Sequence, residues 1–65
     1  MKKNELMAAM MDKVIAKNNK RRNPLPLSRM DIRELGFFAA CLFVSGKSDA
    51  SIDREIGRAL NSACL

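Results

Sequence analysis

Apolar residues recur at helical spacing over residues 4–17. Residues three and four positions apart share one side of a helix, so two adjacent apolar rows form a single stripe. Asn4 is placed to cap the start, and Glu5 complements the positive end of the helix dipole. Lys13 and Lys17 complement its negative end. The stripe comprises Leu6, Met7, Met10, Met11, Val14 and Ile15.

The next segment, residues 18–27 (NNKRRNPLPL), interrupts the helical pattern. Its two prolines cannot lie inside a helix, and each forces extended geometry on the residue before it. We therefore expect a basic, non-helical linker, with Leu25 and Leu27 free to contact the core.

A second helix is predicted over residues 29–45. Ser28 and Asp31 form a variant of the capping box, and Gly46 is the expected left-handed stop. The stretch LGFFAACLFV within it is apolar on all sides. Ten residues span about 15 Å, half of a bilayer core, so this stretch is too short to cross a membrane. A strand is the alternative for residues 37–44 (FFAACLFV), but Ala39, Ala40 and Leu42 disfavour it, and no partner strand is apparent.

A third helix is predicted over residues 49–63, with Ser48 or Asp49 as its cap. Its apolar residues follow a clean helical repeat. They are Ile52, Ile56, Ala59, Leu60 and Ala63. The sequence thus predicts one all-α domain, residues 1–65, with the apolar middle helix at its centre. Two flanking helices of so short a chain cover only part of that helix, so we expect a homodimer to cover the rest.

Positive charge is concentrated in the first half of the chain. Residues 1–33 hold nine Lys and Arg against three acids, a balance of +6, whereas residues 34–65 hold three against four, a balance of −1. The sum is the net charge of +5. An anionic partner is the expectation: nucleic acid or an acidic protein surface.

Several chemistries lack their usual residues. The chain has no His, and its two cysteines, Cys41 and Cys64, cannot form a four-ligand zinc site alone. Glycines are isolated, so no phosphate-binding loop is apparent. We expect a non-enzymatic protein without metal or cofactor. Lys2 and Lys3 precede polar residues rather than an apolar signal segment, so a cytoplasmic location with reduced thiols is expected.

The basic residues around the linker are the main candidates for a binding site. Phosphate contact is one interpretation, and a solvated basic linker is the other. No aromatic residue is interleaved with this charge, which disfavours stacking on single-stranded bases, and a non-helical tract disfavours a membrane-surface helix. The candidates are Lys17, Lys20, Arg21, Arg22, Arg29 and Arg33, with Arg54 and Arg58 as secondary members.

Two apolar groups are candidates for the dimer or partner interface. The aromatic group consists of Phe37, Phe38 and Phe43. The methionine group consists of Met7, Met10 and Met11 and either offers a plastic binding surface or belongs to the core.

Residues 46–57, GKSDASIDREIG, resemble the first half of a helix-turn-helix of the LuxR or sigma-factor type. Those families show an apolar helix, a glycine, a Ser-Asn/Asp start, an Ile, and an Ile/Leu-Gly pair before the recognition helix. Leu27-Ser28-Arg29 and residues 31–44 also resemble the leading helix, with Asp31 one position off. The resemblance covers about half of the chain and implies DNA binding. The family's recognition helix has no counterpart after Gly57, where eight residues remain.

Two functions follow from these observations. The first is a small nucleic-acid-binding regulator whose basic residues contact phosphates. The second is an accessory protein of the phage or plasmid type that binds and inhibits a host protein complex, such as a defence or transcription enzyme, through an acidic surface on that complex.

Overall fold

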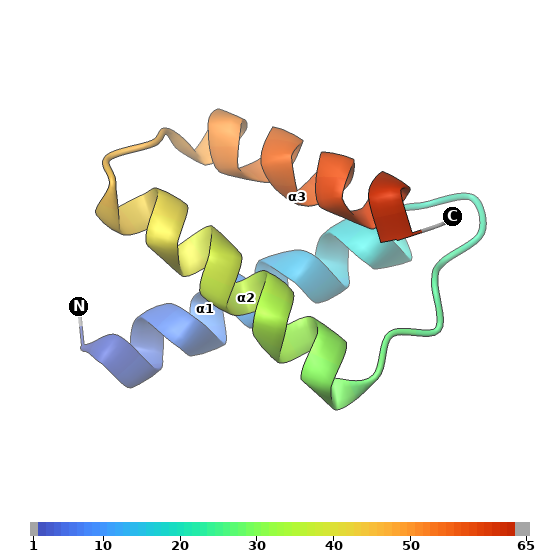
Figure 1. Ribbon diagram of the computed structural model, residues 1–65, viewed down its shortest axis with the longest axis horizontal. Helices are drawn as coiled ribbons and strands as arrows, with labels where there is room; N and C mark the ends of the chain where they lie inside the picture. Colours follow the sequence, from blue (N-terminus) through green and yellow to red (C-terminus); the bar gives the residue numbers. More distant parts are fainter. Residues whose placement is uncertain (1, 64–65) are drawn as a thin grey trace.

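The computed structural model describes residues 2–63, which fold into three helices: α1 (Lys3–Asn19), α2 (Arg29–Val44) and α3 (Asp49–Ala63) (Figure 1). Within that range no residue lies in a strand, so the all-α, three-helix prediction is confirmed and the strand alternative for residues 37–44 is wrong. α1 begins one residue before and ends two residues after its predicted bounds, and α2 ends one residue earlier. None of the helices within residues 2–63 combines the length and apolar character needed to span a bilayer.

Local hydrogen bonds account for the starts of α2 and α3. The Asp31 backbone N–H donates to Ser28 Oγ at 3.1 Å, and the Ser28 N–H donates to Asp31 Oδ2 at 3.1 Å, which confirms the capping box. Ser48 caps α3, since its Oγ accepts from the Ser51 N–H at 3.2 Å. The cap predicted at Asn4 is wrong, because α1 already begins at Lys3.

The end of α2 follows the predicted glycine rule. Gly46 has a φ of 87°, in the left-handed region that favours glycine. The Lys47 N–H then donates to the Leu42 carbonyl oxygen at 3.1 Å, which closes the helix end. The chain therefore turns directly from α2 into the segment that leads to α3.

Asn18 links α1 to the extended segment that follows it. Its side chain is only 6% exposed, and its Nδ2 donates to the Leu25 carbonyl at 2.9 Å while its Oδ1 accepts from the Leu25 N–H at 3.0 Å. Leu25 and Leu27 pack against the core, as predicted. Asn18 is therefore a helical residue that holds the linker, rather than a member of that linker.

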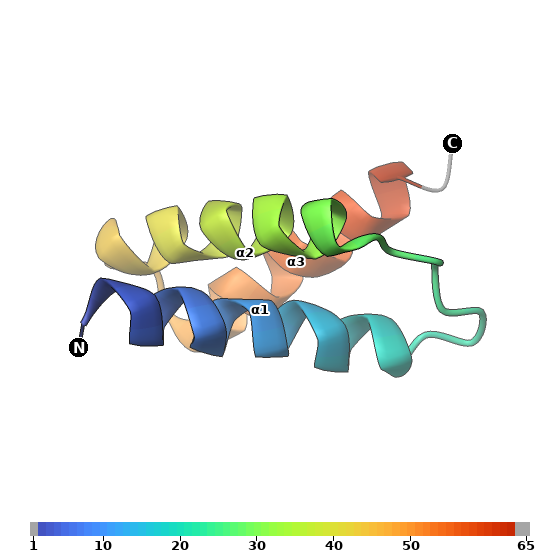
Figure 2. The same ribbon diagram turned by 90° about the horizontal axis from the view of Figure 1, so that it is seen from below.

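The core lies between the three helices, and α2 is not at its centre. The fully enclosed side chains of Ile52, Ile56 and Leu60 come from α3, and that of Val14 comes from α1. α2 contributes only small buried residues, and Figure 2 shows that its side turned away from α1 is uncovered. The expected central position of this helix is therefore wrong. The complete buried set is Met10, Val14, Ala39, Ala40, Ile52, Ile56 and Leu60.

The methionine group belongs mainly to this core. Met10 is 4% exposed, and Met7 is half-buried against the core. Met11 packs where α1 crosses α2, since a Cβ added to Gly36 would lie 2.6 Å from its Cγ. The predicted place of Met10 in a dimer or partner interface is therefore wrong, because its own chain encloses it.

Candidate nucleic-acid interface

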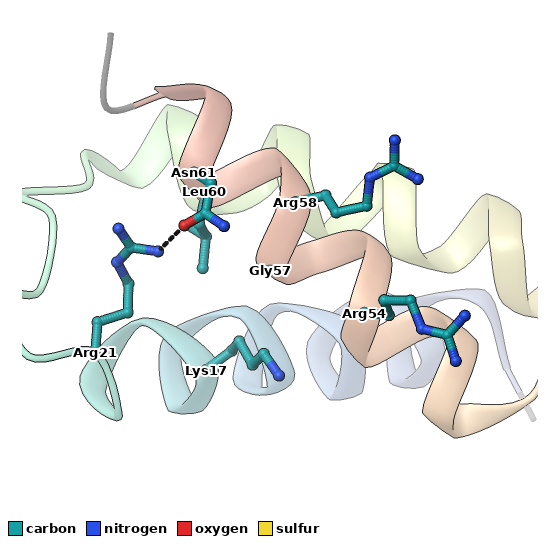
Figure 3. A pocket seen from close by; sticks show the side chains of 7 residues that line it. All are labelled: Lys17, Arg21, Arg54, Gly57, Arg58, Leu60 and Asn61. Atoms are coloured by element: carbon teal, nitrogen blue, oxygen red, sulfur yellow. Dashed lines mark hydrogen bonds between the residues drawn. The ribbon is translucent and has the colours of Figure 1, made fainter.

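Four basic side chains line one open groove between α1 and α3 (Figure 3). Lys17 lies in the last turn of α1 and Arg21 follows that helix, while Arg54 and Arg58 lie on α3. The groove has a volume of about 410 Å³, and its other lining residues are Gly57, Leu60 and Asn61. We call this site, with its seven lining residues, the basic groove.

Gly57 determines how closely Lys17 approaches α3. A Cβ added at this position would lie 3.3 Å from Lys17 Cε, tighter than ordinary van der Waals contact. The lysine stem therefore lies close to the glycine, which places Lys17 at the groove that Arg54 and Arg58 also line.

Arg54 and Arg58 are four residues apart and leave α3 on the same side (Figure 3). Both residues are exposed. Arg58 Nη1 lies 3.3 Å from Glu55 Oε1, with side-chain exposures of 75% and 36%, so this ion pair is a weak, solvated one. None of the seven described residues that line the groove is acidic. The groove therefore keeps a strongly positive balance.

Arg21 has a structural contact within the groove. Its Nη1 donates to Asn61 Oδ1 at 2.7 Å, which ties the chain after α1 to the last turns of α3. Asn61 was not among the predicted site residues, because a single polar residue on a helix carries no signal of such a contact. Arg21 thus contributes charge to the groove from a fixed position.

The remaining basic candidates lie outside the groove. Lys20 and Arg22 are exposed at the end of α1 and in the turn that follows it. Arg29 and Arg33 are exposed in the first two turns of α2. The structure therefore brings Lys17 and Arg21 together with the two secondary candidates of α3, and separates them from the two arginines of α2.

Lys13, one turn before Lys17, has a different environment. Its Nζ lies 3.5 Å from Asp53 Oδ1 and 3.9 Å from Asp49 Oδ1, both in the first turns of α3. The two ends of the contact between α1 and α3 therefore differ in local charge. Carboxylates neutralise the lysine at one end, and cations collect at the other.

The described part of the chain, residues 2–63, contains no group of three or more His, Cys, Asp or Glu residues placed to hold a metal ion. Cys41 is an exposed free thiol on α2. Cys64 lies outside the described residues. Phe37, Phe38 and Phe43 are 60%, 37% and 42% exposed, so all three predicted interface aromatics remain at the surface of the single chain.

Compared with known protein families, curated proteins and solved structures, the chain matches none of them. The resemblance to a helix-turn-helix stays a prediction from the sequence.

Proposed function

We propose that this protein is a non-enzymatic nucleic-acid-binding module that acts as a homodimer and contacts phosphates through the basic groove. The observation that carries this proposal is the meeting of Lys17, Arg21, Arg54 and Arg58 at one open surface. In sequence these residues come from opposite ends of the chain. Their convergence in the fold concentrates positive charge where one extended anion can contact several of them.

The geometry of the groove suits a phosphate backbone better than a base. Arg54 and Arg58 are separated by about 6 Å along the axis of α3, so their guanidinium groups can reach different phosphates of one strand. None of the seven described lining residues is aromatic, so they offer no stacking platform for bases. We therefore expect binding with little sequence preference and a steep dependence on salt.

A salt series measures this dependence directly. If the chain neutralises three phosphates, the logarithm of the binding constant falls with the logarithm of salt with a slope of about −2.7 for duplex DNA. Fluorescence anisotropy of a labelled duplex from 50 to 200 mM NaCl gives that slope. No binding at the lowest salt would refute the proposal.

Arg54→Glu tests whether the basic groove itself makes the contact. Arg54 is exposed, so the substitution changes charge with little effect on packing. We expect the dissociation constant to rise at least about tenfold, because one attraction becomes a repulsion. Lys3→Glu is the matched control, because it makes the same charge change at the start of α1, outside the basic groove. We expect it to raise the dissociation constant less than about threefold. Equal losses in both variants would place the binding elsewhere or make it diffuse.

The competing hypothesis, an acidic protein surface as partner, has a different signature. The chain has no Trp and no Tyr, so strong absorbance of the purified protein at 260 nm reports bound nucleic acid. A partner retained on the immobilised protein after nuclease treatment, with no 260 nm signal and no duplex binding, would favour the protein partner. Release of the bound material by nuclease supports the nucleic-acid proposal.

A further inference from the structure

The side of α2 turned away from α1 exposes several apolar residues, with the charged Arg33 and Glu34 between Met30 and Phe37 along the helix. Met30, Phe37, Cys41 and Val44 recur at i, i+7, i+11 and i+14, a spacing that places them on one side of a helix, and Phe38 lies beside them. Met30 is 70%, Phe37 60% and Val44 76% exposed, and Cys41 is also exposed. We call these five residues the outer α2 face.

The inner side of α2 explains why large apolar residues point outward. Gly36, Ala39 and Ala40 are the buried residues of this helix, and they face α1 and the core. The close approach of α1 at Gly36 leaves room only for small side chains there. The aromatic residues Phe37, Phe38 and Phe43 are exposed, and Figure 2 shows no other segment above α2.

The area of the outer α2 face fits a modest dimer interface. With about 200 Å² for a fully exposed large side chain, the face offers roughly 400 Å² of apolar surface, as large as the main patch of a typical monomer. Two such faces bury roughly 800 Å² between them, which is below the about 1,200 Å² at which standard stable interfaces begin. This is the scale of a weak, concentration-dependent dimer.

Charges at the two ends of α2 are complementary to each other. Asp31 and Glu34 lie near its start and line a depression of about 450 Å³ with Leu25, Pro26, Leu27 and Leu35. Lys47 is exposed just beyond its end, fixed there by its backbone hydrogen bond to Leu42. By helical spacing, Arg29 and Arg33 lie along the opposite edge of the outer α2 face from these two acids.

We propose that a second copy of this chain docks on the outer α2 face, with the two α2 helices antiparallel about a two-fold axis close to Phe37. Phe37 then packs on Phe37 of the second copy, and Val44 of each copy packs near Met30 of the other. Lys47 of each copy reaches Asp31 and Glu34 of the other, so the ion pairs form twice, as an isologous interface requires. Antiparallel helix dipoles favour the same orientation.

This inference rests on the homodimer of the proposed function and specifies its interface. The basic groove lies between α1 and α3 with α2 behind it (Figure 3), so docking through α2 leaves both grooves of the dimer open. Two open grooves double the number of phosphate contacts for each particle.

The first experiment measures mass in solution. Sedimentation equilibrium of the full chain over a range of concentrations gives the dimer dissociation constant, and circular dichroism checks the fold of each variant. We expect Phe37→Glu to raise the constant at least about tenfold, because it buries an unpaired carboxylate at the two-fold axis. Ala8→Glu is the matched control, since it adds the same charge at an exposed position of α1, and it should leave the constant within about twofold.

The second experiment tests the antiparallel orientation. In the Glu34→Lys variant by itself, and likewise in Lys47→Glu, like charges face each other at both ends of the interface. We expect the dimer dissociation constant of each variant to rise about fivefold or more. An equimolar mixture of the two variants restores opposite charges at both ends. The mixture should therefore form a heterodimer at least as stable as the dimer of the original chain.

A disulfide provides the third experiment. In a Cys41→Ser, Cys64→Ser background, Phe37→Cys places two thiols at the two-fold axis, and mild oxidation should convert most of the protein to a covalent dimer. Arg54→Cys in the same background is the control and should remain largely monomeric.

The three results separate the possible failures. A dimer that persists in Phe37→Glu and shows no heterodimer preference overturns this interface while the homodimer stands. A monomer at every concentration overturns both the homodimer and the interface. Duplex binding is measured separately, so its loss bears on the basic groove alone.

Discussion

α1 crosses two helices, each at a glycine, and the two crossings have opposite characters. At Gly36 it meets α2 through Met11, and the glycine is buried. At Gly57 it meets α3 through Lys17, and the glycine lines the open basic groove. Both glycines let helices approach closely. What fills the space differs: a thioether side chain closes the first crossing to solvent, whereas a lysine stem leaves the second open and charged.

Close helix packing therefore contributes to stability at the first crossing and positions a charged side chain at the second. The same substitution at the two glycines should therefore give stability changes of opposite sign. Substitutions of the lysines on α1 should affect binding only where the second crossing gathers cations.

Gly36→Ala should have the largest effect on the free energy of unfolding. The added Cβ would lie 2.6 Å from Met11 Cγ and 3.3 Å from the Met11 backbone nitrogen, so the Met11 side chain or the helix that carries it must shift. Overpacking of this kind costs about 1–3 kcal/mol, which outweighs the gain of up to about 1 kcal/mol in helix propensity. We expect a net loss of about 1–2 kcal/mol in a urea titration followed by circular dichroism. A more stable variant would show that the first crossing is not tight.

The helices themselves were predictable from the sequence because local rules determine them. Ser28 with Asp31 starts α2, and Gly46 ends it, by hydrogen bonds and backbone conformation that involve only near neighbours. The contacts of Leu25 and Leu27 with the core were also predictable, because the non-helical linker between the first two helices still carries apolar residues. These features need no knowledge of how the helices pack.

The position of α2 was not predictable in the same way. A helix that is apolar on every side gives no signal of which side is buried, so the sequence predicted only that this helix would be surrounded and that its aromatics would lie at an interface. The structure buries the small residues Ala39 and Ala40 instead, because the spacing to α1 at Gly36 determines which side chains fit. That spacing is a tertiary property.

The basic groove was predictable only in part. Its members on either side, such as Lys17 and Arg54, were candidates by charge, but they are 37 positions apart, and nothing in the sequence placed them together. The contact of Arg21 with Asn61 and the role of Asn18 depend on the return of α3 and of the linker to α1. Long-range contacts of single polar residues carry no periodic pattern.

Lys17→Gln and Lys13→Gln form the next test, on binding rather than stability. Lys17 lines the basic groove, so its neutralisation should lower duplex affinity about three- to tenfold and reduce the magnitude of the salt slope by about 0.9. Lys13 faces Asp49 and Asp53, and its neutralisation should leave affinity nearly unchanged. Anisotropy titrations at several salt concentrations measure both. Equal losses would contradict the division of this helix contact into a neutralised and a cationic end.

Gly57→Ala should stabilise the protein slightly, in contrast to the same change at Gly36. The added Cβ would lie 3.3 Å from Lys17 Cε, near the free end of a flexible side chain that can move aside. Alanine favours the helix by up to about 1 kcal/mol, so we expect a net gain of about 0.5 kcal/mol in the free energy of unfolding. The displaced lysine should also weaken duplex binding by about twofold or less. Destabilisation by more than about 1 kcal/mol would mean that the second crossing is as closely packed as the first.

Asp53→Asn should have the smallest effect, because it removes a solvated ion pair. Lys13 and Asp53 keep 30% and 47% of their side chains exposed at a separation of 3.5 Å, so solvent screens much of their attraction. We expect a loss of about 0.3 kcal/mol in low salt that disappears in 1 M NaCl, measured by chemical unfolding at both salt concentrations. Asp12→Asn, which removes an exposed carboxylate elsewhere on α1, is the control for the change in net charge. A loss that persists in high salt would show that Asp53 acts through hydrogen bonding or packing, and that the neutralised end of the α1–α3 contact is more rigid than its exposure implies.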